Sequence, residues 1–192
     1  MKRGLKILLI ADSWMNLALG MIGPIYAIFV ERIGGDLLDA SWAYFAFMIT
    51  SGVVMMMLGK WEDRTKHKEK LIVLGYFLGA LGCLMYIFVN GQMTLLITQV
   101  ILGLSVAVIT PAFDAFYSRH TTKKEEAFDW GSVEAEWYIV TAVSAIIGGY
   151  VADIFGFRTL FTVMFVISLI SVIISLRLLK GENYLNSNKS IV

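Results

Sequence analysis

The stretch Gly59-Lys-Trp-Glu-Asp-Arg-Thr-Lys-His-Lys68 joins two long apolar runs and carries several charges behind a glycine. The run before it, residues 41–59, and the run after it, residues 71–89, contain no Asp, Glu, Lys or Arg. Each run approaches the roughly 20 residues that an α-helix needs to cross a hydrocarbon layer about 30 Å thick. The stretch therefore predicts a polar connection between two transmembrane helices.

The rest of the chain repeats this alternation. Of the 192 residues, 58% are hydrophobic and only 16% are charged, with a mean hydropathy of +0.73, whereas soluble domains carry about 25% charged residues. The continuous apolar runs lack the alternation of a transmembrane β-barrel. We expect an all-α integral membrane protein with a six-helix transmembrane domain, residues 1–180, and a polar cytoplasmic tail, residues 181–192. The predicted helices cover about 7–30, 41–59, 71–89, 92–116, 133–153 and 157–177.

The basic residues predict the orientation of these helices. Of the 16 lysines and arginines, all except Arg32 and Arg158 flank the predicted helices on one side of the membrane. Since Lys and Arg in short loops are retained in the cytoplasm, we expect both termini and the Gly59–Lys68 loop to be cytoplasmic. The membrane that we expect for the protein is the cell membrane. The net charge of +1 gives no attraction to nucleic acid. The expected partner is the lipid bilayer, which the apolar runs require.

Nothing in the sequence predicts an enzyme or a metal site. His67 and His120 lie in different loops without a second ligand three or four residues away, and Cys83 is the single cysteine. The chain has no Gly-rich phosphate loop, no Gly-x-Ser-x-Gly and no His-Glu-x-x-His pattern. We therefore expect no catalytic residues, no metal and no cofactor.

The Gly59–Lys68 stretch resembles the loop between the second and third helices of the major facilitator superfamily. The pattern of that loop is glycine, three residues, aspartate, arginine or lysine, any residue, a second glycine and two basic residues. Gly59, Asp63, Arg64 and Lys68 match it, whereas Lys66 stands where the second glycine belongs.

Other segments support the resemblance, which covers roughly residues 8–178. Pro111-Ala-Phe-Asp-Ala115, Gly148-Gly149 and the turn at 155–161 stand at family-like places. The antiporter motif of the family has a glycine and a proline where this chain has Ser144 and Ala145. The sequence therefore does not favour exchange over symport or uniport.

The resemblance covers one half of the usual twelve-helix fold. In this superfamily the two six-helix halves are parallel repeats with the substrate site between them. We expect transport of a small solute by alternating access, as a homodimer or with a second half-transporter chain. The alternative is a truncated half or a membrane scaffold that binds a partner membrane protein without transport. Substrate, coupling ion and direction do not follow from the sequence.

The resemblance implies that the first and fourth helices line the cavity and that the second and fifth form the interface between halves. Asp12 and Asn16 are one turn apart and share a face of the first helix. In the fifth helix a polar stripe recurs at spacings of three and four. Glu134 and Glu136 in its first turn have a structural alternative, since the helix dipole favours carboxylates there by roughly 0.3 to 1 kcal/mol. The candidates for the cavity, the substrate or a proton are Asp12, Asn16, Gln99, Glu134, Trp137 and Thr141.

A second group of candidates belongs to the predicted gate. Asp114, near the cytoplasmic end of the fourth helix, is a candidate partner for Arg64 or Lys68. The functional interpretation is that Asp12, Asp114 and Glu134 converge at the cytoplasmic mouth of one cavity and that one of them carries a proton. The predicted gating residues are Gly59, Asp63, Arg64, Lys68 and Asp114.

Overall fold

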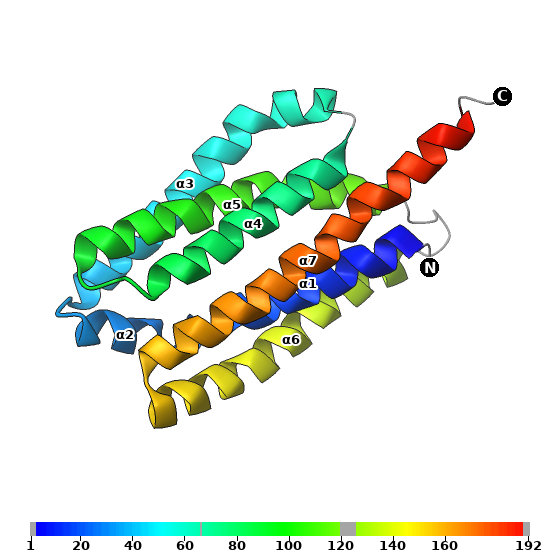
Figure 1. Cartoon of the computed structure of the whole chain (residues 1–192). Helices are drawn as coiled ribbons and strands as arrows, with labels where there is room; N and C mark the ends of the chain where they lie inside the picture. Colours follow the sequence, from blue (N-terminus) through cyan, green and yellow to red (C-terminus); the bar gives the residue numbers. More distant parts are fainter. Residues whose placement is uncertain (1–2, 66, 120–125, 190–192) are drawn as a thin grey trace.

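The computed structural model describes residues 3–65, 67–119 and 126–189, and every regular element in these ranges is helical. Six segments are long and apolar enough to cross a membrane. Figure 1 shows them as one elongated bundle. The helices are α1 (Arg3–Gly20), the 3-10 helix η1 (Gly23–Ile25), α2 (Tyr26–Arg32), α3 (Leu37–Arg64), α4 (Lys68–Tyr86), α5 (Gln92–Ser118), α6 (Glu126–Phe155) and α7 (Phe157–Lys189).

The first span, expected as one helix over residues 7–30, is broken into α1, η1 and α2. The break follows Gly20 and contains Gly23 and Pro24. Glycine has little preference for helix and proline has no backbone N–H to continue the hydrogen-bond series, so the regular helix stops here. The span resumes as α2 and ends before Gly34, whose φ of 87° is in the left-handed region that glycine adopts readily.

The helices extend beyond the ranges expected from hydropathy, and α3, α6 and α7 do so furthest. α3 begins at Leu37 rather than 41, where Asp36 and Asp39 each accept a hydrogen bond from the other's backbone N–H, at 2.9 and 3.0 Å. α6 begins at Glu126 rather than 133. α7 continues to Lys189 through the segment expected as a polar tail, since no proline interrupts it. Hydropathy marks the membrane-embedded part of a helix, and the backbone hydrogen bonds continue past it.

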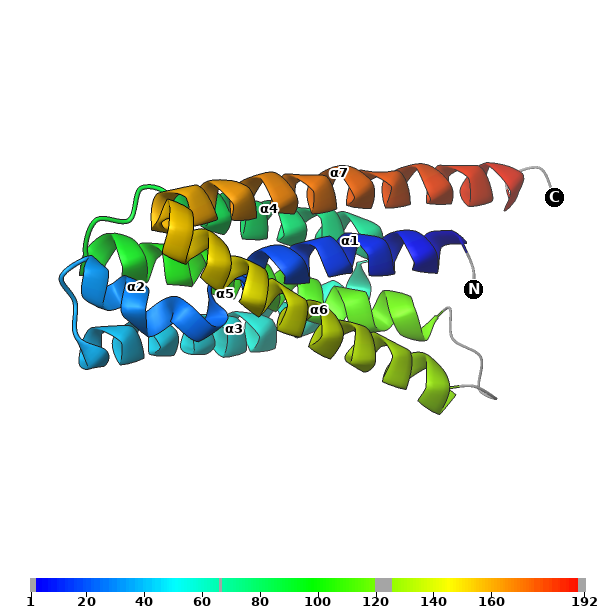
Figure 2. The same cartoon turned by 90° about the horizontal axis from the view of Figure 1, so that it is seen from below.

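The helices pack as two groups. α1, α6 and α7 contact one another, α5 contacts both α3 and α4, and the packing of α4 against α7 joins the groups. Figure 2 shows α7 and α4 on one side of the bundle, and α3 and the lower part of α6 on the other. Only 11% of the α3 span and 17% of the α6 span are buried within the bundle, compared with 56% of α4. α3 and α6 therefore leave the largest uncovered apolar surfaces.

Most lysines and arginines of the sequence stand in segments at one end of the bundle. α1 begins, α3 joins α4, and α5 ends at the same end of the bundle, called here the basic end (Figure 1). The opposite end, called the α2 end, holds α2 and the connections α4–α5 and α6–α7. The α6–α7 connection is a tight turn at Gly156, with φ 81°.

Candidate functional site

A polar cavity of about 260 Å³ lies among α1, α4, α5 and α6. Apolar side chains such as Met15 and Ile109 complete its wall. A cavity with mostly apolar walls and a few polar groups is the usual form of a small-molecule site. Its polar and aromatic lining residues are Asp12, Asn16, Tyr76, Ser105, Thr110, Phe113, Asp114 and Trp137.

Asp12 of α1 is held in the cavity wall by two neutral donors. The Tyr76 hydroxyl donates to its Oδ1 at 2.9 Å, and the Asn16 Nδ2 donates to its Oδ2 at 2.8 Å. Next to it, the backbone oxygen of Ala11 accepts a hydrogen bond from the Ser171 hydroxyl of α7 at 2.6 Å. Asp12 is therefore fixed in both backbone and side chain while keeping acceptor capacity toward the cavity.

Close packing of α4 against α5 brings Tyr76 to Asp12. A Cβ added at Gly75 would collide with the Ile109 side chain, so only glycine allows this approach. The Ser105 hydroxyl donates to the Gly75 backbone oxygen at 2.8 Å and joins the two helices. Tyr76 is fully buried as a result.

Close packing of α6 against α1 brings Trp137 to the same cavity. A Cβ at Gly148 would collide with the backbone of Met21, and a Cβ at Gly20 would collide with the Ser144 side chain. Small residues that let two backbones approach closely are typical of helix contacts in membranes. This contact also places the Glu136 carboxylate near enough to Asp12 for the two charges to interact.

The structure brings four of the predicted residues to the cavity: Asp12, Asn16, Asp114 and Trp137. Glu134 is exposed and lies close enough to Asp114 for their charges to interact, but it does not line the cavity. The dipole explanation for Glu134 fails, because α6 begins at Glu126 and Glu134 is no longer in its first turn.

Two other predicted residues lie elsewhere. Thr141 belongs to the α1–α6 contact, where its backbone oxygen accepts from the Ser144 hydroxyl at 2.9 Å. Gln99 lies toward the α2 end, and its Nε2 donates to the Tyr26 hydroxyl at 2.8 Å and to the Tyr86 hydroxyl at 3.0 Å. Neither side chain lines the cavity.

The predicted gating residues are only partly described. Arg64 is exposed at the end of α3, and Lys68 is buried at the start of α4. Asp114 makes no ion pair with either of them in the described part of the chain. Gly59 is half-buried, and the side chain of Asp63 lies outside the described residues. The gating role stays a prediction.

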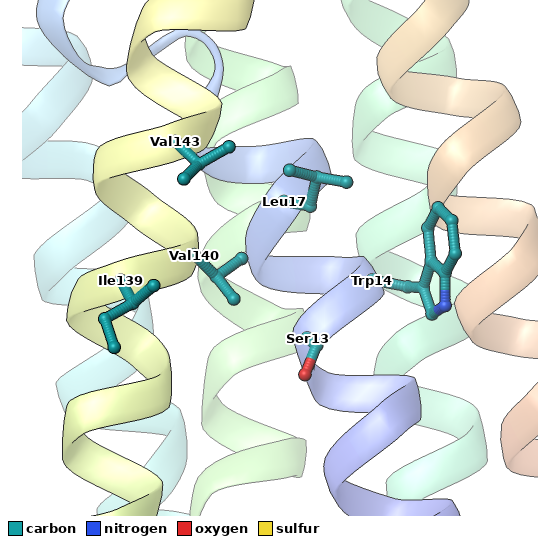
Figure 3. Close-up of a pocket in the computed structure, with 6 residues that line it drawn as sticks. All are labelled: Ser13, Trp14, Leu17, Ile139, Val140 and Val143. Carbon is teal, nitrogen blue, oxygen red and sulfur yellow. The ribbon is translucent and has the colours of Figure 1, made fainter.

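A second pocket, of about 210 Å³, is apolar. Figure 3 shows Leu17 of α1 and Val140 and Val143 of α6 around it, with the Trp14 ring extending toward α7. Its one polar side chain, Ser13, donates its hydroxyl to the Leu9 backbone oxygen at 2.9 Å. This pocket offers no polar group to orient a solute, whereas the Asp12 cavity offers several.

Sequence reasoning missed Tyr76, Ser105 and Glu136. Tyr76 stands in a charge-free run, and its hydroxyl was the available signal, because a buried tyrosine hydroxyl needs a partner. Glu136 was assigned with Glu134 to a helix start that the structure places at Glu126. For metals, no three His, Cys, Asp or Glu side chains gather among the described residues.

Six apolar spans, four of which line a cavity with polar groups in its wall, define a multi-pass membrane protein. The model of the Major Facilitator Superfamily matches residues 9–190, and the chain belongs to that family.

The relatives place the chain within this family. It is 24% identical over 189 residues to an uncharacterized MFS-type transporter of Methanocaldococcus jannaschii, covering 98% of this chain and 48% of the relative. It is 28% identical over 164 residues to multidrug resistance protein 2 of Bacillus subtilis, covering 85% of this chain and 40% of the relative. The chain thus spans less than half the length of these two relatives. It spans 89% of the uncharacterized MFS-type transporter YitZ of Bacillus subtilis, at 24% identity over 77% of this chain.

Among solved structures, the fold is similar to that of PepTSo, a POT family transporter, with a TM-score of 0.72 at 12% sequence identity. The match covers 91% of this chain and 37% of PepTSo. It therefore supports the six-helix fold.

Proposed function

We propose that these six spans form one half of an alternating-access transporter for a small solute. The polar cavity around Asp12 carries this proposal, because it places a fixed carboxylate, an amide and an indole on the wall of one space of about 260 Å³. In transporters built from two parallel repeats, the substrate site lies between the repeats near the midplane of the membrane. The cavity wall described here is one side of such a site.

We propose further that a second set of six spans completes the site, from another copy of this chain or from another six-helix chain. The uncovered surfaces of α3 and α6 support this pairing, since these spans are only 11% and 17% buried. A two-fold axis along the membrane normal would place two copies the same way up, as the family architecture requires.

The experiment that tests the function is a solute screen on the full chain in lipid nanodiscs. Solutes that raise the unfolding temperature are then tested for flux into proteoliposomes, with Asp12→Asn as the loss variant. Asp153→Asn is the control, because Asp153 is exposed on α6 and does not line the cavity. Flux that Asp12→Asn abolishes and Asp153→Asn retains is the expected result. A bound solute that never crosses the membrane would support the scaffold alternative.

The pairing and the topology are tested separately. Crosslinking and mass measurement in mild detergent are expected to give two six-helix units per particle, and a monomer alone would contradict the pairing. For topology, we expect the basic end to face the cytoplasm of the cell. A membrane-impermeant thiol reagent should label Arg32→Cys but not Arg64→Cys in intact cells, in a Cys83→Ala background.

A further inference from the structure

The negative charge of Asp12 has no positive partner in the described part of the chain. Both of its oxygens accept hydrogen bonds, from Tyr76 at 2.9 Å and from Asn16 at 2.8 Å, and both donors are neutral. These bonds fix the carboxylate without balancing its charge. Charged groups within a membrane span are costly unless they pair or serve a substrate or ion pathway.

Glu136 adds a second unbalanced charge beside the first. Both of its carboxylate oxygens are buried and accept no hydrogen bond from the described residues. The Ser13 hydroxyl of α1 lies close enough to interact with this carboxylate, but its single proton is shared with the Leu9 backbone oxygen, 2.9 Å away, and it brings no positive charge. A carboxylate whose oxygens are buried and that no cation balances is costly, so a positively charged ligand beside it would be stabilising.

The remaining charges at the cavity have the same sign. Asp114 lines the cavity, and Glu134 lies near Asp114. No lysine, arginine or histidine is found among the lining residues in the described part of the chain. The indole of Trp137 also belongs to the wall, and an aromatic face attracts a cation electrostatically.

We propose that the cargo of this cavity is a small organic cation, with Asp12 and Glu136 balancing its charge and Trp137 contacting its apolar part. That the cation is transported rests on the proposed function, but its binding in the cavity does not depend on transport. An amine or quaternary ammonium ion supplies the positive charge that both carboxylates lack. The apolar wall beside them, including Met15 and Ile109, accommodates the carbon groups of such an ion.

The test compares charged ligands with uncharged ligands of the same shape. The full chain is placed in phosphatidylcholine nanodiscs, which carry no net charge. Binding is measured by calorimetry for tetramethyl-, tetraethyl- and tetrabutylammonium, and for choline against its uncharged carbon isostere dimethylbutanol. We expect at least one ammonium ion to bind, and choline to bind at least about tenfold more tightly than the isostere if choline fits.

Matched variants assign the effect to the two carboxylates. Asp12→Asn keeps the shape, removes the charge and replaces one of the two accepting oxygens by an NH2 group, and we expect it to weaken cation binding at least about tenfold. We expect Glu136→Gln to weaken it about threefold or more. Asp153→Asn removes the same charge from an exposed position on α6 and should leave binding unchanged.

Each outcome decides the proposal. Absence of binding by every ammonium ion, equal binding of the uncharged isostere, or equal losses in Asp12→Asn and Asp153→Asn would overturn it. Cation-selective binding that depends on Asp12, without flux into proteoliposomes, would uphold the cation site and reject the transport function instead.

Discussion

Two polar clusters lie inside this bundle, and they differ in charge. The Asp12 cluster consists of Asp12, Asn16 and Tyr76, which line the cavity, and Glu136, which lies close enough to Asp12 for their charges to interact. The Gln99 cluster consists of Gln99, Tyr26 and Tyr86, lies toward the α2 end and is neutral. Aromatic packing surrounds the Gln99 cluster, since the Tyr86 ring stacks on Phe161 with centroids 4.9 Å apart.

The difference separates a structural use of polar groups from a functional one. Neutral groups that bond one another join helices inside a membrane at modest free-energy cost. The Gln99 cluster does this by joining α5 to α2 and α4. The Asp12 cluster is fixed in the same way but keeps charges that nothing in the described chain balances. We therefore expect changes in the first cluster to alter ligand binding and changes in the second to alter stability.

The largest expected effect comes from removing both charges. The double variant Asp12→Asn with Glu136→Gln should weaken ammonium binding by about 100-fold or more, because each carboxylate contributes to balancing one buried cation. Calorimetry in nanodiscs measures it, together with both single variants. A double-mutant cycle should show coupling, since residues that share a ligand are not additive. Retention of binding in the double variant would remove the distinction between the clusters.

The next effect breaks the Asp12 cluster by geometry rather than charge. Gly148→Ala places a Cβ against the backbone of Met21, which cannot rotate away. We expect it to lower the free energy of unfolding by about 2 kcal/mol and to weaken ammonium binding, because Glu136 is carried on the displaced helix. Thermal unfolding and calorimetry measure the two effects.

Gly149→Ala is the matched control, because nothing lies within 4 Å of a Cβ at that position. It should leave binding unchanged and stability unchanged or slightly raised, since alanine favours a helix more than glycine does. Equal losses in the two variants would mean that the α1–α6 contact does not position Glu136.

The sequence predicted the parts of this arrangement that follow from composition. The six spans follow from apolar runs of membrane length, and the family follows from the charged stretch at Gly59–Lys68. Asp12, Asn16 and Trp137 were identified because polar residues one turn apart share a face.

The remaining parts depend on which face of a helix meets which neighbour. The polar stripe of the fifth predicted helix runs through Glu134, Trp137, Thr141, Ser144 and Gly148, and its first three members were the cavity candidates. In the structure its later members make the close contact with α1, because small residues serve close packing as well as a polar lining. Glu136 lies beside that stripe in sequence, and only the packing of α6 on α1 brings it to Asp12.

A smaller effect is expected in the Gln99 cluster. Gln99→Leu removes the donor to two tyrosine hydroxyls at 2.8 and 3.0 Å. Loss of the partner of a buried polar group costs about 1 to 3 kcal/mol, so the unfolding temperature should fall. Ammonium binding should be unchanged. Gln92→Leu, at an exposed position on the same helix, is the control. A loss of binding in Gln99→Leu would show that the two clusters are coupled.

The smallest effect concerns how firmly Asp12 is held. Tyr76→Phe removes one of its two donors and leaves the ring, so we expect a loss of about 1 kcal/mol in stability. Ammonium binding should weaken by about threefold to fivefold, because a less restrained carboxylate loses more conformational freedom when it binds. Calorimetry and thermal unfolding again provide the measurements.

Tyr150→Phe is the matched control for Tyr76→Phe, since Tyr150 is 64% exposed on α6 and should tolerate the change. If Tyr76→Phe strengthened cation binding, the Tyr76 hydroxyl would be a competitor for the Asp12 charge rather than its support. The Asp12 cluster would then bind its ligand by displacing Tyr76, and the carboxylate would no longer be fixed in advance. A weaker affinity with no more than the small loss of stability expected for Tyr76→Phe would instead assign Tyr76 to positioning the carboxylate that receives the cation.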